Sequence, residues 1–247
     1  MLLAFGEETY EDSIRRFWLC VDAMSGGNSA VLNRMKDEIV AGVDFIPLSG
    51  KPSAFIKSDR SNVFTTENLT DFQEVVSEGK YSLVVIDPQS RFSGSANEND
   101  NGVATVFVQA IETLTQLESK PSVIVVHHTS KSGRDGAASS VSARGAGAYT
   151  DGMRWCMQLS SIKHKTASGL SIVLSDIVKT NYTEQFETQA LVRRKGGLLT
   201  IPSDKELPEV KLAMDNPNIK QPSAAVAGKP LPEPPDFSDD PWSGLGR

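Results

Sequence analysis

The sequence has few cysteines, no long apolar run and no excess of positive charge. Cys20 and Cys156 are its only cysteines, and they lie in apolar surroundings without the spacing of metal ligands. We therefore expect buried thiols in a reducing compartment rather than a disulfide. No apolar run is long enough to cross a bilayer, and residues 1–5 lack the basic residues that begin a signal peptide. These absences predict a cytoplasmic protein that does not enter a membrane.

The overall charge and size limit the class of protein further. The net charge is -6 and the isoelectric point is about 5.2, so any contact with nucleic acid must come from a local basic patch. With 247 residues and 39% hydrophobic content, the chain is long enough to bury one substantial core. Length alone indicates one or two domains.

Residues 81–128 carry the clearest pattern in the chain. Two apolar runs rich in β-branched residues, 82–86 and 122–126, predict strands buried on both faces. Between them, apolar residues recur at intervals of three and four over 103–117, which predicts one face of a helix. A strand, a helix and a strand in this order form a right-handed βαβ unit. The sequence therefore predicts an α/β fold with a mainly parallel sheet.

Polar side chains stand where the predicted strands end. Asp87 follows the first run, and His127 and His128 follow the second. Residues 2–5 predict another strand, with Glu7 just beyond it. Ligands bind beyond the carboxyl ends of strands in open parallel sheets, so we expect these side chains to share one site.

The remaining elements follow from caps, breakers and alternation. Thr9 is a plausible helix N-cap, and Asn28 or Ser29 caps a second helix after the break at Gly26 and Gly27. The other predicted elements are a strand at 43–48, a loop with a short strand at 51–68, a helix at 69–78, a strand from 154, a strand at 171–178 and a glycine-turned hairpin at 188–201. We expect the late strands to form an antiparallel extension of the parallel sheet.

Two segments have the composition of surface or disordered chain. Residues 129–142 hold small residues with Lys131 and Arg134, and predict a surface loop. Residues 202–247 are predicted to be a largely disordered, proline-rich acidic tail, which leaves 1–201 as the folded domain. Phe237 and Trp242 lie among the acids of this tail. They are either incidental or a docking peptide for a partner.

The residues at the strand ends suggest phosphate chemistry. An aspartate that ends an apolar strand, as Asp87 does, is a Walker B pattern that serves a Mg²⁺ ion on a nucleotide. Glu7 is placed to orient and deprotonate a water, and His128 to bond a phosphate oxygen. Each residue also has a simpler interpretation, as a helix cap or a polar strand end. Arg144, Arg154 and Lys179 are cations at element ends, where solvated surface charge is the common explanation.

Several short motifs recur along the chain in a defined order. They are VVIDPQSRF at 84–92, NEND at 97–100, HHTSK at 127–131, ARG at 143–145, DGMRW at 151–155 and KTNY at 179–182. In order and approximate spacing they resemble the RepA family, RecA-like hexameric replicative DNA helicases of plasmids and phages and AAA-type ATPases. The resemblance covers roughly residues 2–201.

The resemblance implies a RecA-like P-loop NTPase core that uses ATP and Mg²⁺, forms a ring and moves on single-stranded DNA. By position, Glu7 resembles the catalytic glutamate, Asp87 the Walker B acid that serves the metal and His128 the phosphate sensor with His127 beside it. Arg154 resembles an arginine finger given to the neighbouring subunit, while Arg144 and Lys179 resemble basic positions near the nucleotide at the interface. A further expectation places Lys131 and Arg134 in the central channel, on the DNA backbone.

One required motif is missing from this sequence. A P-loop ATPase needs a G-x-x-x-x-G-K-[ST] loop, and no such sequence occurs among these 247 residues. Either the chain is the larger part of a split or truncated product, or it has lost nucleotide binding and serves as an accessory module on DNA or on a helicase. We favour the first because Glu7, Asp87, His128 and Arg154 all remain. The isolated chain is expected not to hydrolyse ATP and to associate through an unpaired sheet edge.

Overall fold

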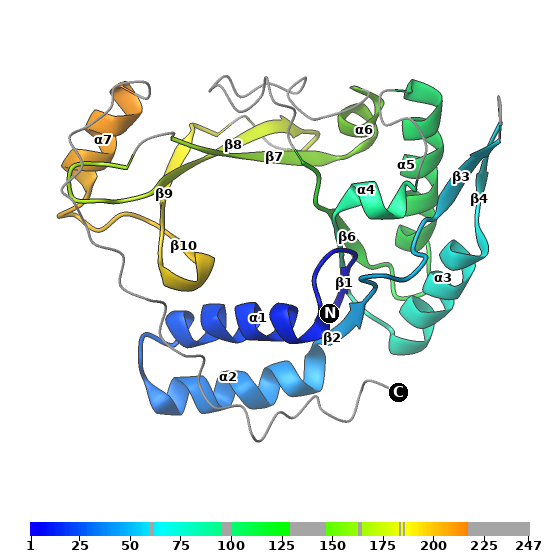
Figure 1. Cartoon of the computed structure of the whole chain (residues 1–247), viewed down its shortest axis with the longest axis horizontal. Coiled ribbons are helices and arrows are strands. Elements are labelled where there is room, and N and C mark those ends of the chain that lie inside the picture. Colours follow the sequence, from blue (N-terminus) through cyan, green and yellow to red (C-terminus); the bar gives the residue numbers. More distant parts are fainter. Residues whose placement is uncertain are drawn as a thin grey trace.

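The computed structural model describes residues 1–59, 62–94, 100–128, 147–162, 165–182, 184 and 186–216 (Figure 1). The helices are α1 (Tyr10–Met24), α2 (Ser29–Gly42), α3 (Glu67–Gly79), α4 (Gln89–Phe92), α5 (Asn101–Thr115), α6 (Gly147–Gly152) and α7 (Leu207–Asp215). The strands are β1 (Leu2–Phe5), β2 (Asp44–Pro47), β3 (Ile56–Asp59), β4 (Asn62–Thr65), β5 (Leu83–Asp87), β6 (Ser122–Val125), β7 (Trp155–Ser161), β8 (Ile172–Thr180), β9 (Gln189–Arg193) and β10 (Leu199–Thr200). None of the helices in these ranges is long and apolar enough to cross a membrane.

A parallel sheet of four strands, in the order β2-β1-β5-β6, forms the centre of the fold. Phe5 on β1 lies opposite Asp87 on β5, and Ile86 on β5 lies opposite Val125 on β6. The three strands therefore end at nearly the same level. This register confirms the predicted parallel α/β arrangement and places Glu7, Asp87 and His128 at one edge of the sheet.

The first helix begins and ends, and the second helix begins, where the sequence predicts. The Thr9 side chain accepts a hydrogen bond from the Asp12 backbone amide and caps α1. Gly26 and Gly27 adopt φ angles of 62° and 78°, which end α1 in a turn that residues with a Cβ atom disfavour. Asn28 then caps α2 by accepting from two backbone amides.

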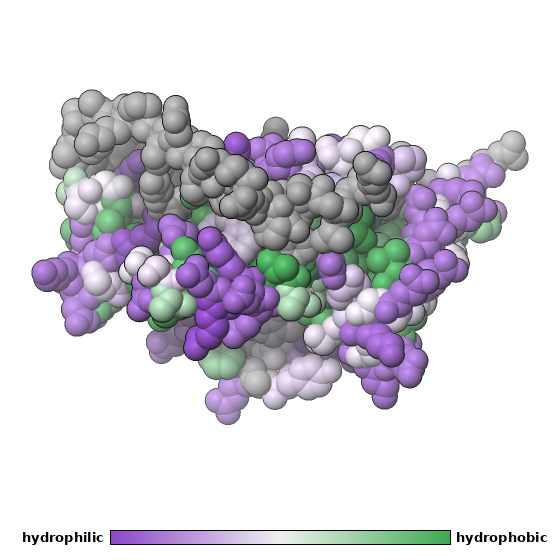
Figure 2. Space-filling model, turned by 90° about the horizontal axis from the view of Figure 1, so that it is seen from below, coloured by the Kyte–Doolittle hydropathy of each residue, from purple (hydrophilic) through white to green (hydrophobic). Residues whose placement is uncertain are grey.

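Each face of the parallel sheet packs against different helices. The face that carries Leu2, Val84 and Ile86 packs on α3 and α5 in the main hydrophobic core. The opposite face carries Phe45 on β2, which contacts Phe17 of α1. Seen from below, polar residues cover much of the surface and hydrophobic residues emerge in small patches between them (Figure 2).

Strand β6 differs from the prediction that it is buried on both faces. It is the last strand of the parallel sheet, and its residues alternate between exposed and half-buried. Ile124 is 48% exposed and Val126, just beyond the strand, is 37% exposed. Ile124 lies on the sheet face that carries Phe45. Helices α1 and α2 cover that face near β2, at the other end of the strand order, and their hydrophobic cluster includes no described residue of β6. The apolar run at 122–126 predicts a strand covered on both faces, whereas β6 forms an open edge of the sheet among the described residues.

The late strands form a sheet of their own. Their order is β10-β9-β8-β7, and every pair is antiparallel. The antiparallel pairing is as predicted, but among the described residues this sheet is not hydrogen-bonded to β6 and so does not extend the parallel sheet. Gly196 and Gly197, with φ angles of 77° and 91°, form the predicted hairpin turn between β9 and β10.

The hairpin turn between β9 and β10 connects the antiparallel sheet to helix α1, which packs on the parallel sheet. Its residues Lys195–Gly197 lie against α1, as Figure 1 shows. A Cβ atom at Gly196 would lie 3.0 Å from the Cβ atom of Leu19 on α1, so the backbone of the turn rests directly on that helix. Glycine is required here both for the positive φ and for this close approach.

Helix α7 packs on the antiparallel sheet beyond the boundary predicted at Ile201. Val210 and Ala213 of α7 are buried with Ile172 and Val192 of the sheet. The folded part therefore continues to Asp215, and residues 217–247 lie outside the described part of the chain.

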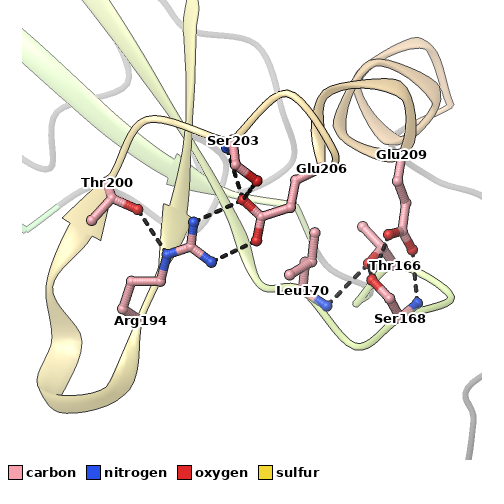
Figure 3. Close-up of polar contacts among 8 residues, drawn as sticks. All are labelled: Thr166, Ser168, Leu170, Arg194, Thr200, Ser203, Glu206 and Glu209. Carbon is pink, nitrogen blue, oxygen red and sulfur yellow. Dashed lines mark hydrogen bonds and ion pairs between the residues drawn. The ribbon is translucent and has the colours of Figure 1, made fainter.

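Two carboxylates at the start of α7 fasten it to the sheet (Figure 3). Glu206 accepts hydrogen bonds from both terminal nitrogens of Arg194, at 2.6 and 2.8 Å, and from the backbone amide and hydroxyl of Ser203. Glu209 accepts from the backbone amide and the hydroxyl of Ser168 in the loop between β7 and β8. Paired charges with planar, bidentate geometry are the strongest of surface contacts.

We predict that Glu206→Gln lowers the melting temperature at pH 7. The bond with Arg194, followed by those from Ser203, holds the pKa of Glu206 well below its ordinary value of 4.5. A lowered pKa stabilises the fold above pH 4.5, and this contribution is lost as the pH falls below that value. Thermal unfolding should show the largest difference from wild type at neutral pH and a shrinking one towards pH 2 to 3.

Glu118→Gln is the matched control, because Glu118 is exposed and has no ion pair among the residues that the structure describes. An equal loss for both variants, or a difference that does not depend on pH, would show that the carboxylate of Glu206 does not clamp α7.

Candidate active site at the carboxyl edge of the parallel sheet

Glu7, Asp87 and His128 follow three adjacent parallel strands. Backbone hydrogen bonds hold the strand ends together: Gly6 donates to the Asp87 carbonyl at 2.7 Å, and Gln89 donates to the Val126 carbonyl at 2.7 Å. The structure thus places the three predicted side chains at one edge, contributed by segments that are far apart in the sequence.

Asp87 is half-buried at the end of β5. Burial raises the pKa of its carboxyl above the ordinary value, and the negative charge of Glu7 raises it further. Electrostatic interactions with His128 and with Arg16, which lies on α1, oppose this rise. Glu7 and His128 thus lie near enough to Asp87 for their charges to influence its pKa.

Glu7 lies just beyond β1 and is exposed. Its carboxylate oxygen Oε1 lies 3.3 Å from Nε of Arg91, which comes from the short helix α4. The carbonyl oxygen of Glu7 accepts a hydrogen bond from the Ser49 hydroxyl at 3.2 Å. The backbone of Glu7 and its side chain are therefore held by different segments.

The two histidines beyond β6 have different surroundings. His128 is exposed at the edge with Asp87, whereas His127 is half-buried. The ring of His127 packs beside that of Tyr149 on α6, with 5.6 Å between the ring centroids, and its Nδ1 atom lies 2.7 Å from the His128 carbonyl oxygen. His127 thus connects the edge of the sheet to α6.

Two of the predicted cations, Arg154 and Lys179, lie near β7 and β8 of the antiparallel sheet. Arg154 is exposed just before β7, and its carbonyl accepts a hydrogen bond from the Asn181 amide at 3.1 Å. The ammonium group of Lys179 on β8 donates to the carbonyls of Thr150 and Asp151 near the end of α6. In this arrangement Lys179 binds the carbonyl end of a helix, where a cation is favourable. Lys131, Arg134 and Arg144 lie outside the described residues, as do Phe237 and Trp242.

Sequence reasoning did not assign roles to two arginines that act on this site. Arg16 influences the charge of Asp87 from α1 and also forms an ion pair with Glu8. Arg91 pairs with Glu7. Arg91 is part of the motif that follows Asp87, which was a usable signal, whereas nothing local in the sequence connects Arg16 with Asp87.

The described residues fit only part of a magnesium–nucleotide site. The half-buried Asp87 carboxylate, at the end of its strand, suits one ligand position of Mg²⁺ or of its bound water. No group of three or more His, Cys, Asp and Glu side chains within the described ranges forms a ready-made metal site. The chain also lacks the glycine-rich loop and lysine that bind phosphates. The phosphate half of the site is therefore not contained in this sequence.

Open parallel α/β sheets bind their ligands at the carboxyl edge, where these titratable side chains lie. Residues 6–134, more than half of the 247, match the family model described as "AAA domain". The chain belongs to this family, whose members are P-loop ATPases. The AAA-type ATPase part of the sequence-based prediction is thereby confirmed.

Other comparisons add little to this assignment. Among curated proteins none matches the chain. A solved structure titled "Crystal structure of the RadB recombinase" is 12% identical, with a TM-score of 0.42, and the likeness covers 82% of this chain and 90% of that one.

We predict that Asp87→Asn raises the melting temperature at pH 7. A raised pKa means that the folded state holds this proton more tightly than the unfolded chain, so the ionised carboxylate opposes folding. The penalty is absent below the ordinary pKa of 3.8 and appears as the pH rises through the folded-state value. Thermal unfolding at pH 7 and pH 3 should therefore show a gain at pH 7 that disappears at pH 3.

Asp37→Asn is the control, because Asp37 is an exposed carboxylate on α2. If Asp87→Asn destabilises the protein at pH 7, or changes it no more than Asp37→Asn does, the edge of the sheet does not disfavour the charge of Asp87.

Proposed function

We propose that this chain is the larger part of a DNA-dependent ATPase, the replicative DNA helicase core of a phage or plasmid replication system. It acts with a P-loop segment that its sequence does not contain. The observation that carries this proposal is the meeting of Glu7, Asp87 and His128 at the carboxyl edge of three adjacent parallel strands. Membership of the AAA domain family supports the ATPase part of the proposal.

Each residue at the edge has a chemical task in this proposal. Glu7, exposed and beside Asp87, orients an attacking water and accepts its proton. Asp87 serves as the ligand for Mg²⁺ or its water, and His128 donates a hydrogen bond to a phosphate oxygen. Bound ATP and Mg²⁺ would supply the phosphoryl group and the charge that polarises it. The loop that binds the phosphates must come from the P-loop segment.

The open edge of β6 offers a place for that segment. Its outer backbone groups have no strand partner among the described residues, and the side chains of Ile124 on the strand and Val126 just beyond it are exposed. Strand β7 is also the last strand of its sheet, and Trp155, Met157 and Leu159 are exposed along one of its faces. A strand and helix that carry the P-loop would pair with β6 and cover such apolar side chains, as strand addition does elsewhere.

The finer parts of the proposal concern assembly. The protein works in the cytoplasm as a ring of six subunits, and the resemblance of its sequence motifs to hexameric helicases supports this number. Arg154, exposed before β7, reaches the nucleotide of the neighbouring subunit, with Arg144 and Lys179 near the same interface. Lys131 and Arg134 contact the backbone of single-stranded DNA, and Phe237 and Trp242 dock a replication partner.

A second candidate function is a non-catalytic accessory module that binds DNA or a helicase. The absence of any P-loop sequence among the 247 residues favours it. In this case the open β6 edge would accept a strand from the helicase itself. The two functions differ in one measurable respect, which is whether an added P-loop segment restores hydrolysis that depends on Glu7.

We predict that the P-loop segment binds along β6, and that Ile124→Lys prevents its binding. The segment is sought in the coding sequence upstream of the Met1 codon, co-expressed with this chain and tested by co-purification. A charge at Ile124 would be buried by an added strand and covering helix, which is costly without a partner. Leu212→Lys is the control, since Leu212 is also exposed but lies on α7. Equal co-purification with both variants would contradict this placement.

We predict DNA-stimulated ATP hydrolysis by the complex and none by the chain alone. Glu7→Gln should lower kcat by roughly 10²- to 10⁴-fold, the usual contribution of a general base. Glu74→Gln, at an exposed position on α3, should leave kcat unchanged. The motor is ruled out if the complex does not hydrolyse ATP, if Glu7→Gln is as active as wild type, or if the upstream sequence encodes no P-loop. These outcomes would leave the accessory module.

A further inference from the structure

Arg91 contacts the side chain to which the proposed function assigns the attacking water. Its Nε atom lies 3.3 Å from Oε1 of Glu7, and within the described ranges no other side chain hydrogen-bonds to the Glu7 carboxylate. Both side chains are exposed, at 57% for Arg91 and 45% for Glu7. An ion pair with this exposure contributes little to the stability of a fold because water and salt screen it. Its main effect is to restrict where the Glu7 carboxylate lies.

Arg91 is itself held at a fixed place. It belongs to α4, in which Phe92 is fully buried, and the Phe92 carbonyl accepts a hydrogen bond from the Phe55 amide at 2.6 Å. The carbonyl of Arg91 accepts from the buried Ser53 hydroxyl at 3.2 Å. The backbone of α4 is therefore anchored to the core, and only the guanidinium end of Arg91 reaches the edge of the sheet.

The stem of Arg91 lies directly on the backbone before Glu7. A Cβ atom added to Gly6 would lie 2.7 Å from Cβ and 2.8 Å from Cγ of Arg91, which is closer than real Cβ contacts. The Gly6 amide is also tied to the Asp87 carbonyl at 2.7 Å, so this backbone cannot easily move away. Glycine is required at position 6 because Arg91 occupies the space that a side chain would take.

We propose that Arg91 is a positioning residue that holds the Glu7 carboxylate in one orientation beside Asp87. This inference rests on the proposed function, since it assigns to Arg91 a task in the same hydrolysis. Arg91 acts through Glu7 and not on the nucleotide. Gly6 contributes to this positioning, because it has no side chain and so lets Arg91 lie close enough to reach Glu7.

The test uses the complex of the full chain with its P-loop segment. Arg91→Ala should lower kcat roughly 10- to 100-fold, the loss expected when a reacting group is misplaced, while KM for ATP changes less than about twofold. Arg91→Lys should recover part of the loss because it restores a cation near Glu7. Gly6→Ala should reproduce the loss, because its added Cβ atom would displace the Arg91 stem that now lies on Gly6.

Matched controls separate positioning from folding. Arg34→Ala removes an exposed ion pair with Glu38 on α2, and Gly42→Ala adds a Cβ atom with nothing within 4 Å. Both should keep wild-type kcat, and Arg91→Ala should melt within about 4 °C of wild type. If Gly6→Ala does not fold, the comparison of Arg91→Ala with Arg91→Lys still decides the matter.

The outcomes distinguish this inference from the proposed function. Hydrolysis that needs Glu7 but is unchanged in Arg91→Ala overturns the role of Arg91 and leaves the ATPase standing. A loss in Arg91→Ala that lysine does not recover, or that accompanies a large fall in melting temperature, also overturns it. A wild-type complex that does not hydrolyse ATP overturns the proposed function, and the role of Arg91 with it.

Discussion

The site depends on the parallel register of β1, β5 and β6. Because these strands run in the same direction and end at nearly the same level, the residues that follow them meet at one edge. The backbone bonds from Gly6 to Asp87 and from Gln89 to Val126 fasten the strand ends to one another. A shift of one strand would carry Glu7 or His128 away from Asp87, and it would also turn the buried side chains to the wrong face.

Bringing two acids to one edge has an electrostatic cost, which cations reduce. Burial and Glu7 together raise the pKa of Asp87, while Arg16 and His128 oppose that rise. Arg91 pairs with Glu7 from the other side. The arrangement is typical of functional sites, where a protein retains groups that disfavour its own stability because the chemistry requires them.

Some elements of the two sheets are fixed by contacts with helices, whereas strands β6 and β7 end their sheets without a further strand among the described residues. At one end, α7 is clamped by Arg194 and Glu206, and the hairpin turn rests on α1 through Gly196 and Leu19. At the other, β6 ends its sheet with Ile124 and Val126 exposed, and β7 ends the second sheet. An exposed apolar strand edge favours association with a further strand. The proposed P-loop segment gives this edge a partner and the site its phosphate-binding half.

Local patterns in the sequence determined much of this protein. Thr9 and Asn28 fix the helix starts, apolar alternation and β-branched runs give the strands, and an acid or a histidine marks each relevant strand end. These signals suffice because capping, turn and strand preferences act over a few residues. They also predicted that Glu7, Asp87 and His128 would meet, since parallel strands share a carboxyl edge.

Only the tertiary structure decided which strands lie at an edge and which side chains meet across the chain. Residues 122–126 read as a buried strand, yet β6 is exposed because burial depends on what packs against it and not on its own composition. The antiparallel strands form a separate sheet for the same reason, and α7 is ordered by its contacts with Ile172 and Val192. Arg91 and Arg16 reach Glu7 and Asp87 over long sequence separations. No local preference encodes such contacts, because they exist only once the chain has folded.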